Sequence, residues 1–326
     1  MSRWRKRLRS LGIALPLGAG AYYLYHEFIH ATSIPENSVL YSEHSRIKKI
    51  IESVPSLEEK YVPPIFASNP WLNIALFVMK QKFHAYFSNY DRQVIKLDDG
   101  GTVSIDYTTA SLPKDAPIVI CLHTLNGCGA SHYYFVKYAA SRGWRGVVLN
   151  RRGHGGMKLT TGQFNCFGNP SDTNKMIQIV KNKYPKSRFV AMAGLSAGSG
   201  QCVNYLGCYG DHSLIDAAAS LCPAYDIRYA FLRLKKRNAS LDEFLLKGMK
   251  RYFITPNERI LRERNSYALE KCQDASSMHE FVEAHAPFVC STLDDAKPYT
   301  ADAYFAEHNP MVSIPFAALT RFLLRC

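Results

Sequence analysis

The stretch RFVAMAGLSAGSG, at residues 188–200, decides the fold of this chain. A mostly apolar run at 189–193 leads directly into the five residues Gly-Leu-Ser-Ala-Gly, and an amphipathic run at 202–209 follows. The order predicts a strand, a sharp turn and a helix, because a G-x-S-x-G turn holds its central serine in a strained conformation at the end of a strand.

Ser196 is the centre of that turn. Gly194 and Gly198 flank it because side chains there would collide where strand and helix cross closely. The turn lifts the Ser196 hydroxyl out of the sheet and points the free N–H groups of a helix N-terminus at whatever that hydroxyl attacks. The sequence therefore indicates Ser196 as a catalytic nucleophile.

Apolar runs alternate with helical patterns on both sides of the turn. A glycine-rich turn at 98–101 predicts a hairpin between the first two strands, and the continuous apolar run at 116–122 is typical of a strand buried on both faces. The alternation predicts an α/β fold with a mostly parallel, doubly wound sheet. The expected strands are 93–97, 102–108, 116–122, 145–149, 189–193 and 216–222, and the expected helices are 132–140 and 170–183.

The alternation of strands and helices stops at residues 225–311, which are mostly helical by pattern. The candidate helices there are 241–253, 256–264 and 278–284. An insertion after the sixth strand would lie over the carboxyl edge of the sheet, where Ser196 points, so we expect it to form a lid. One more strand is expected at 313–320.

An acyl-transfer serine also needs N–H donors for an oxyanion, a base, and an acid that orients the base. The loop at 123–127 follows the buried strand, so the backbone N–H groups of Leu125 and Ala197 are the expected oxyanion hole. We expect His123 to shape this loop rather than to act as the base.

The sequence identifies no base. Asp226 follows the sixth strand, a place from which an acid can reach the base, and the alternative is that it caps the entrance to the lid. His279, His285 and His308 fall within the expected lid, and their positions favour none of them as a replacement base.

The net charge of +13 raises the question of nucleic acid, but five of these charges precede an apolar run near the N-terminus and a second group lies at 233–237. No nucleic-acid-binding motif is present, so no nucleic-acid partner is expected. The nine cysteines include no C-x-x-C pair. We therefore expect neither a metal nor a cofactor.

The basic N-terminus precedes an apolar segment at 11–29, which is marginally long enough for a membrane span of roughly 20 residues. The charge bias predicts a single-pass type II membrane protein of the endomembranes. A cleaved signal peptide, giving a secreted protein, and a mitochondrial presequence are the alternatives. The expected organisation is an anchor at 1–30, a linker at 31–90 with a helix near the bilayer at 69–87, and a catalytic domain at 91–326 that includes the lid at about 225–311.

Further motifs carry a resemblance to a known family. They are Asp99-Gly100-Gly101, the 123–127 loop with Tyr133-Tyr134, the run Asn150-Arg151-Arg152-Gly153-His154-Gly155, the serine turn, and Cys222-Pro223-Ala224-Tyr225-Asp226. Over about residues 55–320 the chain resembles the α/β-hydrolase-domain family of membrane-anchored lipases and esterases, which includes YheT-like and embryogenesis-associated hydrolases. The resemblance implies an α/β-hydrolase fold and hydrolysis of carboxylic esters of acylglycerols or phospholipids through Ser196.

The chain departs from the family in two ways. Thr124 replaces the usual glycine of the oxyanion loop, and the chain ends before the positions where the family keeps its aspartate and histidine. The expectation is a C-terminally truncated form that lacks the last strand and is a weak hydrolase. The alternative function is a hydrolase-fold protein without catalysis, such as a lipid-binding module. The expected partners are a lipid or small ester and a membrane, and the sequence leaves the oligomeric state open.

Overall fold

The computed structural model describes residues 20–25, 29, 46–57, 59, 69–289, 299–314 and 323–325. The chain divides into two compact units, Met1–Lys82 and Phe83–Cys326. The described helices of the first unit include α2 (Arg46–Glu52), η1 (Pro55–Leu57) and most of α3 (Pro70–Tyr86). The second unit holds the sheet and the candidate site.

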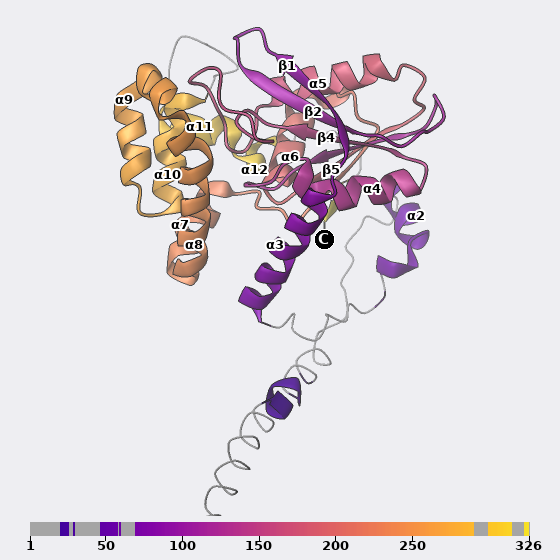
Figure 1. Cartoon of the computed structure of the whole chain (residues 1–326), viewed down its shortest axis with the longest axis horizontal. Helices are drawn as coiled ribbons and strands as arrows, with labels where there is room; N and C mark the ends of the chain where they lie inside the picture. Colours follow the sequence, from indigo (N-terminus) through magenta and orange to yellow (C-terminus); the bar gives the residue numbers. More distant parts are fainter. Residues whose placement is uncertain are drawn as a thin grey trace, which may run out of the picture. The chain divides into compact units, whose positions relative to one another are not determined.

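The sheet of the second unit has seven strands in the order β1-β2-β4-β3-β5-β6-β7 (Figure 1). β1 pairs antiparallel with β2, and β2 pairs antiparallel with β4; every later pairing is parallel. The strands are β1 (Tyr90–Lys96), β2 (Thr102–Thr108), β3 (Ile118–Leu122), β4 (Arg145–Asn150), β5 (Val190–Leu195), β6 (Ala217–Leu221) and β7 (Leu323–Arg325). The predicted α/β-hydrolase fold with a mostly parallel sheet is confirmed.

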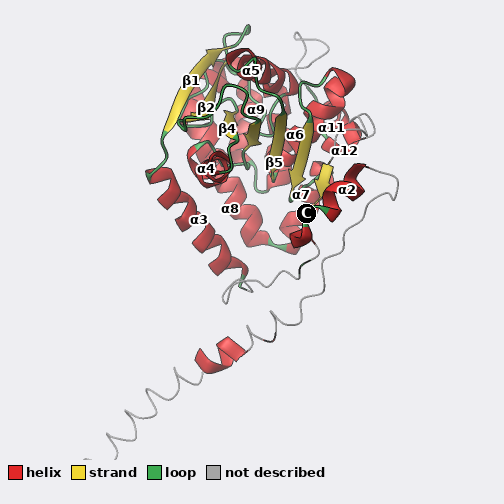
Figure 2. Cartoon of the chain, turned by 90° about the vertical axis from the view of Figure 1, so that its right-hand side faces the viewer, coloured by secondary structure: helices red, strands yellow, loops and turns green. Residues whose placement is uncertain are grey.

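Helices cover both faces of the sheet, because alternate residues of a strand point to opposite sides. Val147 and Leu149 of β4 belong to a core shared with α5 (Pro170–Lys183) and α6 (Ala197–Tyr209), whereas Val148 packs with Val136 of α4 (Tyr133–Ser141). All six residues of β4 are buried, as expected for a central strand (Figure 2). The expected strands and helices before residue 222 agree with the structure to within three residues at each end.

A helical insertion between β6 and β7 forms most of a second core, which is rich in phenylalanine and includes residues of the loops after β3 and β4, among them Leu125 and Phe164. Its helices include α7, which the sequence patterns did not single out. The π-helical turn η4 ends the helix expected at 241–253 early, and Asn265 breaks α9 with extended backbone angles. The elements are α7 (Ile227–Arg237), α8 (Ala239–Met249), η4 (Lys250–Ile254), η5 (Thr255–Asn257), α9 (Glu258–Asp274), α10 (Met278–His285), η6 (Ala286–Phe288), α11 (Ala301–His308) and α12 (Pro310–Ser313). Between the strands lie η2 (Ala130–His132) and η3 (Gly210–His212).

The strand expected at 313–320 is wrong at its start. Ser313 ends α12, and residues 315–322 lie outside the described residues. A short apolar run does not distinguish a strand from a helix. Tertiary contacts decide here: the Asn309 side chain accepts a hydrogen bond from the Ile227 N–H at 2.9 Å and donates one to Asp226 at 3.1 Å, and Pro310 then begins α12.

The expectation of a single-pass type II membrane protein is also wrong. Much of the expected anchor, residues 1–19 and 26–28, lies outside the described residues, and residues 20–25 are helical. Within the described ranges, no helix has both the length and the apolar composition to cross a bilayer. Helix α3, which begins in the first unit, has 17 residues and carries Lys80 and Lys82, so it falls short of the roughly 20 apolar residues needed.

Candidate active site

Ser196 lies at the sharp turn between β5 and α6, with φ 52° and ψ −114°. A positive φ is strained for a residue other than glycine. The two flanking glycines have no room for a side chain: a Cβ on Gly194 would collide with the Gly198 carbonyl, and a Cβ on Gly198 would collide with the Leu122 carbonyl. The backbone is therefore held in the strained form by close strand–helix crossing, as the sequence predicted.

The Ser196 residue opens onto a cavity of about 230 Å³. Leu125 and Ala197, the two predicted oxyanion-hole residues, line the same cavity as Ser196. The remaining walls are apolar and come from the insertion, from α6 and from the loop before α5: Phe167, Gly200, Ala224, Ile227, Ala230, Phe231, Leu234 and Leu245. A cavity with this lining suits an acyl chain, because Ser196 is its one polar side chain among the described residues.

Arg151 fixes the loop that carries Leu125. Its guanidinium donates to the carbonyls of His123 at 2.9 Å and Thr124 at 2.9 Å, and more weakly to that of Leu125 at 3.4 Å. It also donates to Gln201 Oε1 of α6 at 3.1 Å. One side chain therefore ties the loop after β3 to the helix that follows Ser196.

No carboxylate neutralises this buried guanidinium. Arg151 is only 3% exposed, and within the described part of the chain its side chain donates to carbonyl and amide oxygens, with the His154 ring nitrogen 3.4 Å away. Burial lowers the pKa of the Arg151 guanidinium to about 10, so it remains charged at neutral pH. Its Nε has no partner among the described residues. A full positive charge therefore lies behind the loop expected to bind an oxyanion.

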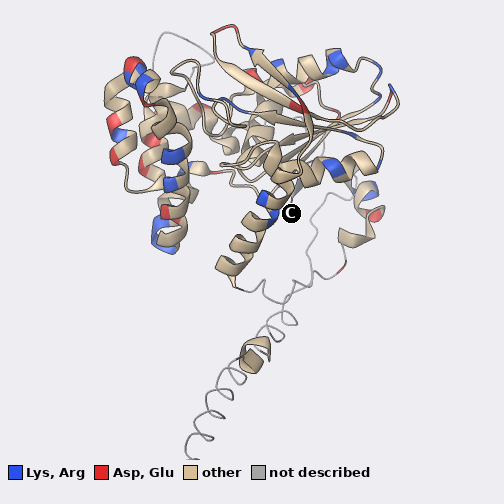
Figure 3. Cartoon of the chain, in the orientation of Figure 1, with Lys and Arg blue, Asp and Glu red and all other residues tan. Residues whose placement is uncertain are grey.

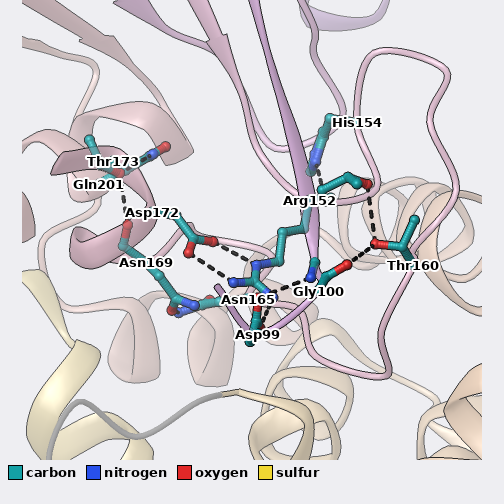
Figure 4. A network of polar contacts seen from close by, with 12 residues as sticks. Asp99, Gly100, Arg152, His154, Thr160, Asn165, Asn169, Asp172, Thr173 and Gln201 are labelled. Carbon is teal, nitrogen blue, oxygen red and sulfur yellow. Dashed lines mark hydrogen bonds and ion pairs between the residues drawn. The ribbon is translucent and has the colours of Figure 1, made fainter. Parts of the chain in front are cut away.

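The neighbouring residues of the same motif make different contacts. Asn150 accepts from the Gly129 N–H at 2.8 Å and donates to buried Asp106 at 2.8 Å. Arg152 points the other way and binds Asp99 and Asp172, the latter at 2.7 and 2.9 Å (Figure 4). His154 hydrogen-bonds the Leu125 carbonyl at 3.0 Å. The sequence singled this motif out as a resemblance only; the available signal was a run of polar residues directly after an apolar strand.

His123 is fully buried, and both its ring nitrogens are engaged. Nδ1 lies 2.9 Å from the Thr124 carbonyl, and Nε2 accepts from the Arg151 N–H at 3.3 Å. Burial and the nearby Arg151 charge hold the pKa of His123 well below its ordinary value. These contacts make His123 a neutral part of the loop.

The structure does not bring the other candidate residues to the cavity. Asp226 caps α7 by accepting from the Tyr229 N–H at 3.0 Å. His279 lies beside Glu283, and His285 contacts Cys166 Sγ at 3.3 Å. His308 is buried, and none of these four lines the Ser196 cavity.

The described residues that line the cavity thus include the two predicted oxyanion-hole residues and an apolar wall, but no titratable side chain. Among the described residues there is also no group of three His, Cys, Asp or Glu side chains placed to hold a metal ion.

Comparisons with known proteins identify the family of the fold. Residues 117–302 match the family described as alpha/beta hydrolase fold. The chain is 25% identical over 327 residues to Phospholipase ABHD3 of Homo sapiens, covering 95% of this chain and 76% of that protein. It is 29% identical over 184 residues to Protein abhd-3.2 of Caenorhabditis elegans, covering 55% of this chain and 48% of that protein.

Monoacylglycerol lipase ABHD2 of Homo sapiens is 25% identical over 223 residues, covering 66% of this chain and 52% of that protein. The chain thus spans about half the length of two of these three curated relatives. Among solved structures it is similar to the esterase Pf2001 of Pyrococcus furiosus, with 20% identity, coverage of 51% of this chain and 65% of that chain, and a TM-score of 0.40.

Proposed function

Because this chain belongs to the α/β-hydrolase fold family, we propose that it hydrolyses carboxylic esters of lipids, with Ser196 as the nucleophile. The observation that carries the proposal is the strained Ser196 backbone at the mouth of an apolar cavity that Leu125 and Ala197 also line. In an α/β-hydrolase elbow, the residue after the serine and a residue of the loop after the third strand supply the oxyanion donors.

In the proposed reaction, Ser196 Oγ attacks the ester carbonyl carbon and its proton passes to a base. The N–H groups of Leu125 and Ala197 stabilise the oxyanion, the alcohol leaves with a proton, and water hydrolyses the acyl-enzyme to release the acid. The apolar wall of α7 and α8 receives the acyl chain. The names of the relatives, a phospholipase and a monoacylglycerol lipase, support glycerolipid esters as the substrate class.

A second candidate function is a lipid-binding protein with little turnover. It is favoured by the absence of a histidine, aspartate or glutamate among the described residues that line the Ser196 cavity. Without a base, only the oxyanion hole and substrate binding accelerate the reaction, and the rate falls orders of magnitude below that of a full triad. Both candidates predict lipid in the same cavity, and they differ in turnover.

A fluorophosphonate probe tests the proposal, because it reacts covalently with an activated serine. We expect the full-length protein to be labelled at Ser196 and to cleave a short fluorogenic ester. Ser196→Ala should abolish both activities, whereas the control Ser171→Ala, an exposed serine outside the cavity, should retain them. Labelling that survives Ser196→Ala would overturn the nucleophile assignment.

The same experiment separates the two candidates. Unlabelled, inactive protein that still binds a fluorescent fatty acid, with binding lost in a cavity-filling variant, would favour the lipid-binding protein. Labelling accompanied by steady turnover would favour the hydrolase.

A further inference from the structure

Helix α7 has two faces of different chemistry. Ile227, Ala230, Phe231 and Leu234 line the Ser196 cavity. The opposite face is exposed and repeats at intervals of three and four residues, through Tyr229, Leu232, Arg233 and Lys236, with Arg237 beside it. We call these five residues the α7 outer face. One helix therefore forms both a wall of the cavity and a basic, partly apolar surface.

The α7 outer face carries unneutralised positive charge. Helix α7 contains no acidic residue. In the described ranges, no carboxylate lies within ion-pair distance of Arg233, Lys236 or Arg237, whereas Arg228, at the start of the helix, pairs with Asp302 at 2.8 Å. Figure 3 shows blue segments along the α7–α8 pair.

Three neighbouring acids interact with groups outside the α7 outer face, and Glu280 among them faces Lys235. Glu243 of α8 pairs with Lys247 at 2.6 Å. Glu280 of α10 accepts from the Ser276 N–H at 2.7 Å, and Glu283 lies near Arg228 at 3.7 Å. The outer face is thus a local cationic surface.

Two large apolar side chains sit among the cations. Tyr229 and Leu232 are each 50% exposed, and Arg233 stacks over the Tyr229 ring at 4.5 Å. Cations bind phosphate headgroups, whereas exposed aromatic and leucine side chains gain free energy by entering the boundary between headgroups and acyl chains. A nucleic acid would attract the cations but offer Leu232 no apolar environment, so the combination favours a lipid surface.

We propose that the α7 outer face binds the surface of an anionic bilayer. Binding there places the cavity wall formed by the same helix directly behind the lipid surface. Delivery of a lipid ester from the bilayer into the cavity rests on the proposed hydrolysis. Binding of the α7 outer face to the bilayer does not rest on it.

Vesicle flotation with the full-length protein tests this proposal. The protein is mixed with vesicles of phosphatidylcholine alone or of phosphatidylcholine with 30% phosphatidylserine. We expect preferential binding to the anionic vesicles, weakening as salt rises because exposed charges are screened. Each basic residue near an anionic surface contributes about 1 kcal/mol, so the triple variant Arg233→Gln/Lys236→Gln/Arg237→Gln should bind roughly 100-fold more weakly.

The matched control removes three exposed cations elsewhere, as Lys114→Gln/Lys186→Gln/Arg188→Gln. These residues precede β3 and β5, so they lie at the opposite edge of the sheet from Ser196. Both triple variants keep the same N-terminal basic residues, so a difference between them reports on α7. Leu232→Gln should weaken vesicle binding at high salt as well as at low salt, because it removes an apolar contact and not a charge.

Equal vesicle binding by the two triple variants would overturn the proposal. So would a wild-type protein that floats equally well with neutral vesicles, or one that binds a DNA duplex but not vesicles. Failure of the proposed function gives a different pattern: the protein would bind anionic vesicles and lose that binding in the α7 variant, yet show no ester hydrolysis. If both proposals hold, the α7 variant hydrolyses a soluble short ester at the wild-type rate and loses activity on vesicle lipids.

Discussion

Arg151→Met is the most informative perturbation of the candidate site. Methionine fills much of the same volume but removes the guanidinium that binds the His123 and Thr124 carbonyls. The loop carrying Leu125 would lose its attachment to Gln201 of α6, and the positive charge behind the proposed oxyanion hole would disappear. We expect the transition state to lose stabilisation while substrate binding in the apolar cavity changes little.

The magnitude follows from the contacts. Loss of one oxyanion-hole donor lowers kcat by about 10²- to 10³-fold. Arg151→Met should displace Leu125 and leave Ala197 in position, so the loss of kcat should lie at the lower end of this range. We expect about a 100-fold lower kcat, which is about 2.7 kcal/mol of transition-state stabilisation, and a KM changed less than about threefold.

Stability should change far less than kcat. The variant leaves the His123 carbonyl and Gln201 Oε1 without the donor that Arg151 supplied, which lowers the free energy of unfolding by about 1–3 kcal/mol for each acceptor. Removing a buried charge that has no counterion relieves a desolvation penalty of several kcal/mol, which opposes that loss. We therefore expect a Tm within a few degrees of wild type.

The assay is kcat and KM on a short fluorogenic ester, or the rate of fluorophosphonate labelling where turnover is slow. Arg151→Lys is the matched control, because lysine keeps the charge but lacks the planar fork of donors; it should lose about tenfold. A folded Arg151→Met protein with wild-type kcat would refute the reasoning. A variant that raises KM and leaves kcat intact would refute it equally.

Three other substitutions and one titration test the remaining contacts. Gly198→Ala should destabilise the protein by roughly 3 kcal/mol or more and abolish fluorophosphonate labelling, because its Cβ collides with backbone carbonyls; a labelled, stable variant would contradict the turn geometry. Asp226→Asn should change kcat less than about threefold, because asparagine caps α7 equally well; a loss near 10⁴-fold would instead make Asp226 the triad acid. Ala230→Leu narrows the cavity and should reduce hydrolysis of long-chain esters more than short ones, whereas exposed Ala239→Leu should leave chain-length preference unchanged. Burial lowers the pKa of His154 to about 3. An unfolded histidine titrates near 6.5, so the stability that the buried neutral form contributes is present at pH 7 and lost progressively as pH falls from about 6.5 toward 3. Urea unfolding should therefore show a loss of about 1 kcal/mol per such histidine between pH 7 and 5.5, and a rise in stability over that range would contradict the buried neutral state.

The sequence by itself determined the features that depend on neighbouring residues. The strained turn at Ser196 follows from two glycines, a preceding apolar run and a following helical run, all within 188–209, and the structure has that turn at that residue. The strands before residue 222 follow from the same kind of local pattern, because side-chain alternation and apolar content are properties of a short window.

Only the tertiary structure decided what depends on distant partners. Arg151 and Arg152 are adjacent and identical in type, yet one binds three carbonyls behind the oxyanion loop and the other binds Asp99 and Asp172. Nothing in their local sequence separates them, because their partners lie about 20 to 50 residues away. The start of α12, where a strand was expected, depends likewise on Asn309 meeting Ile227 and Asp226 more than 80 residues earlier. Adjacent backbone positions at the end of a strand point to opposite faces, so the fold assigns each side chain its environment, and the chemistry of the site follows from that environment.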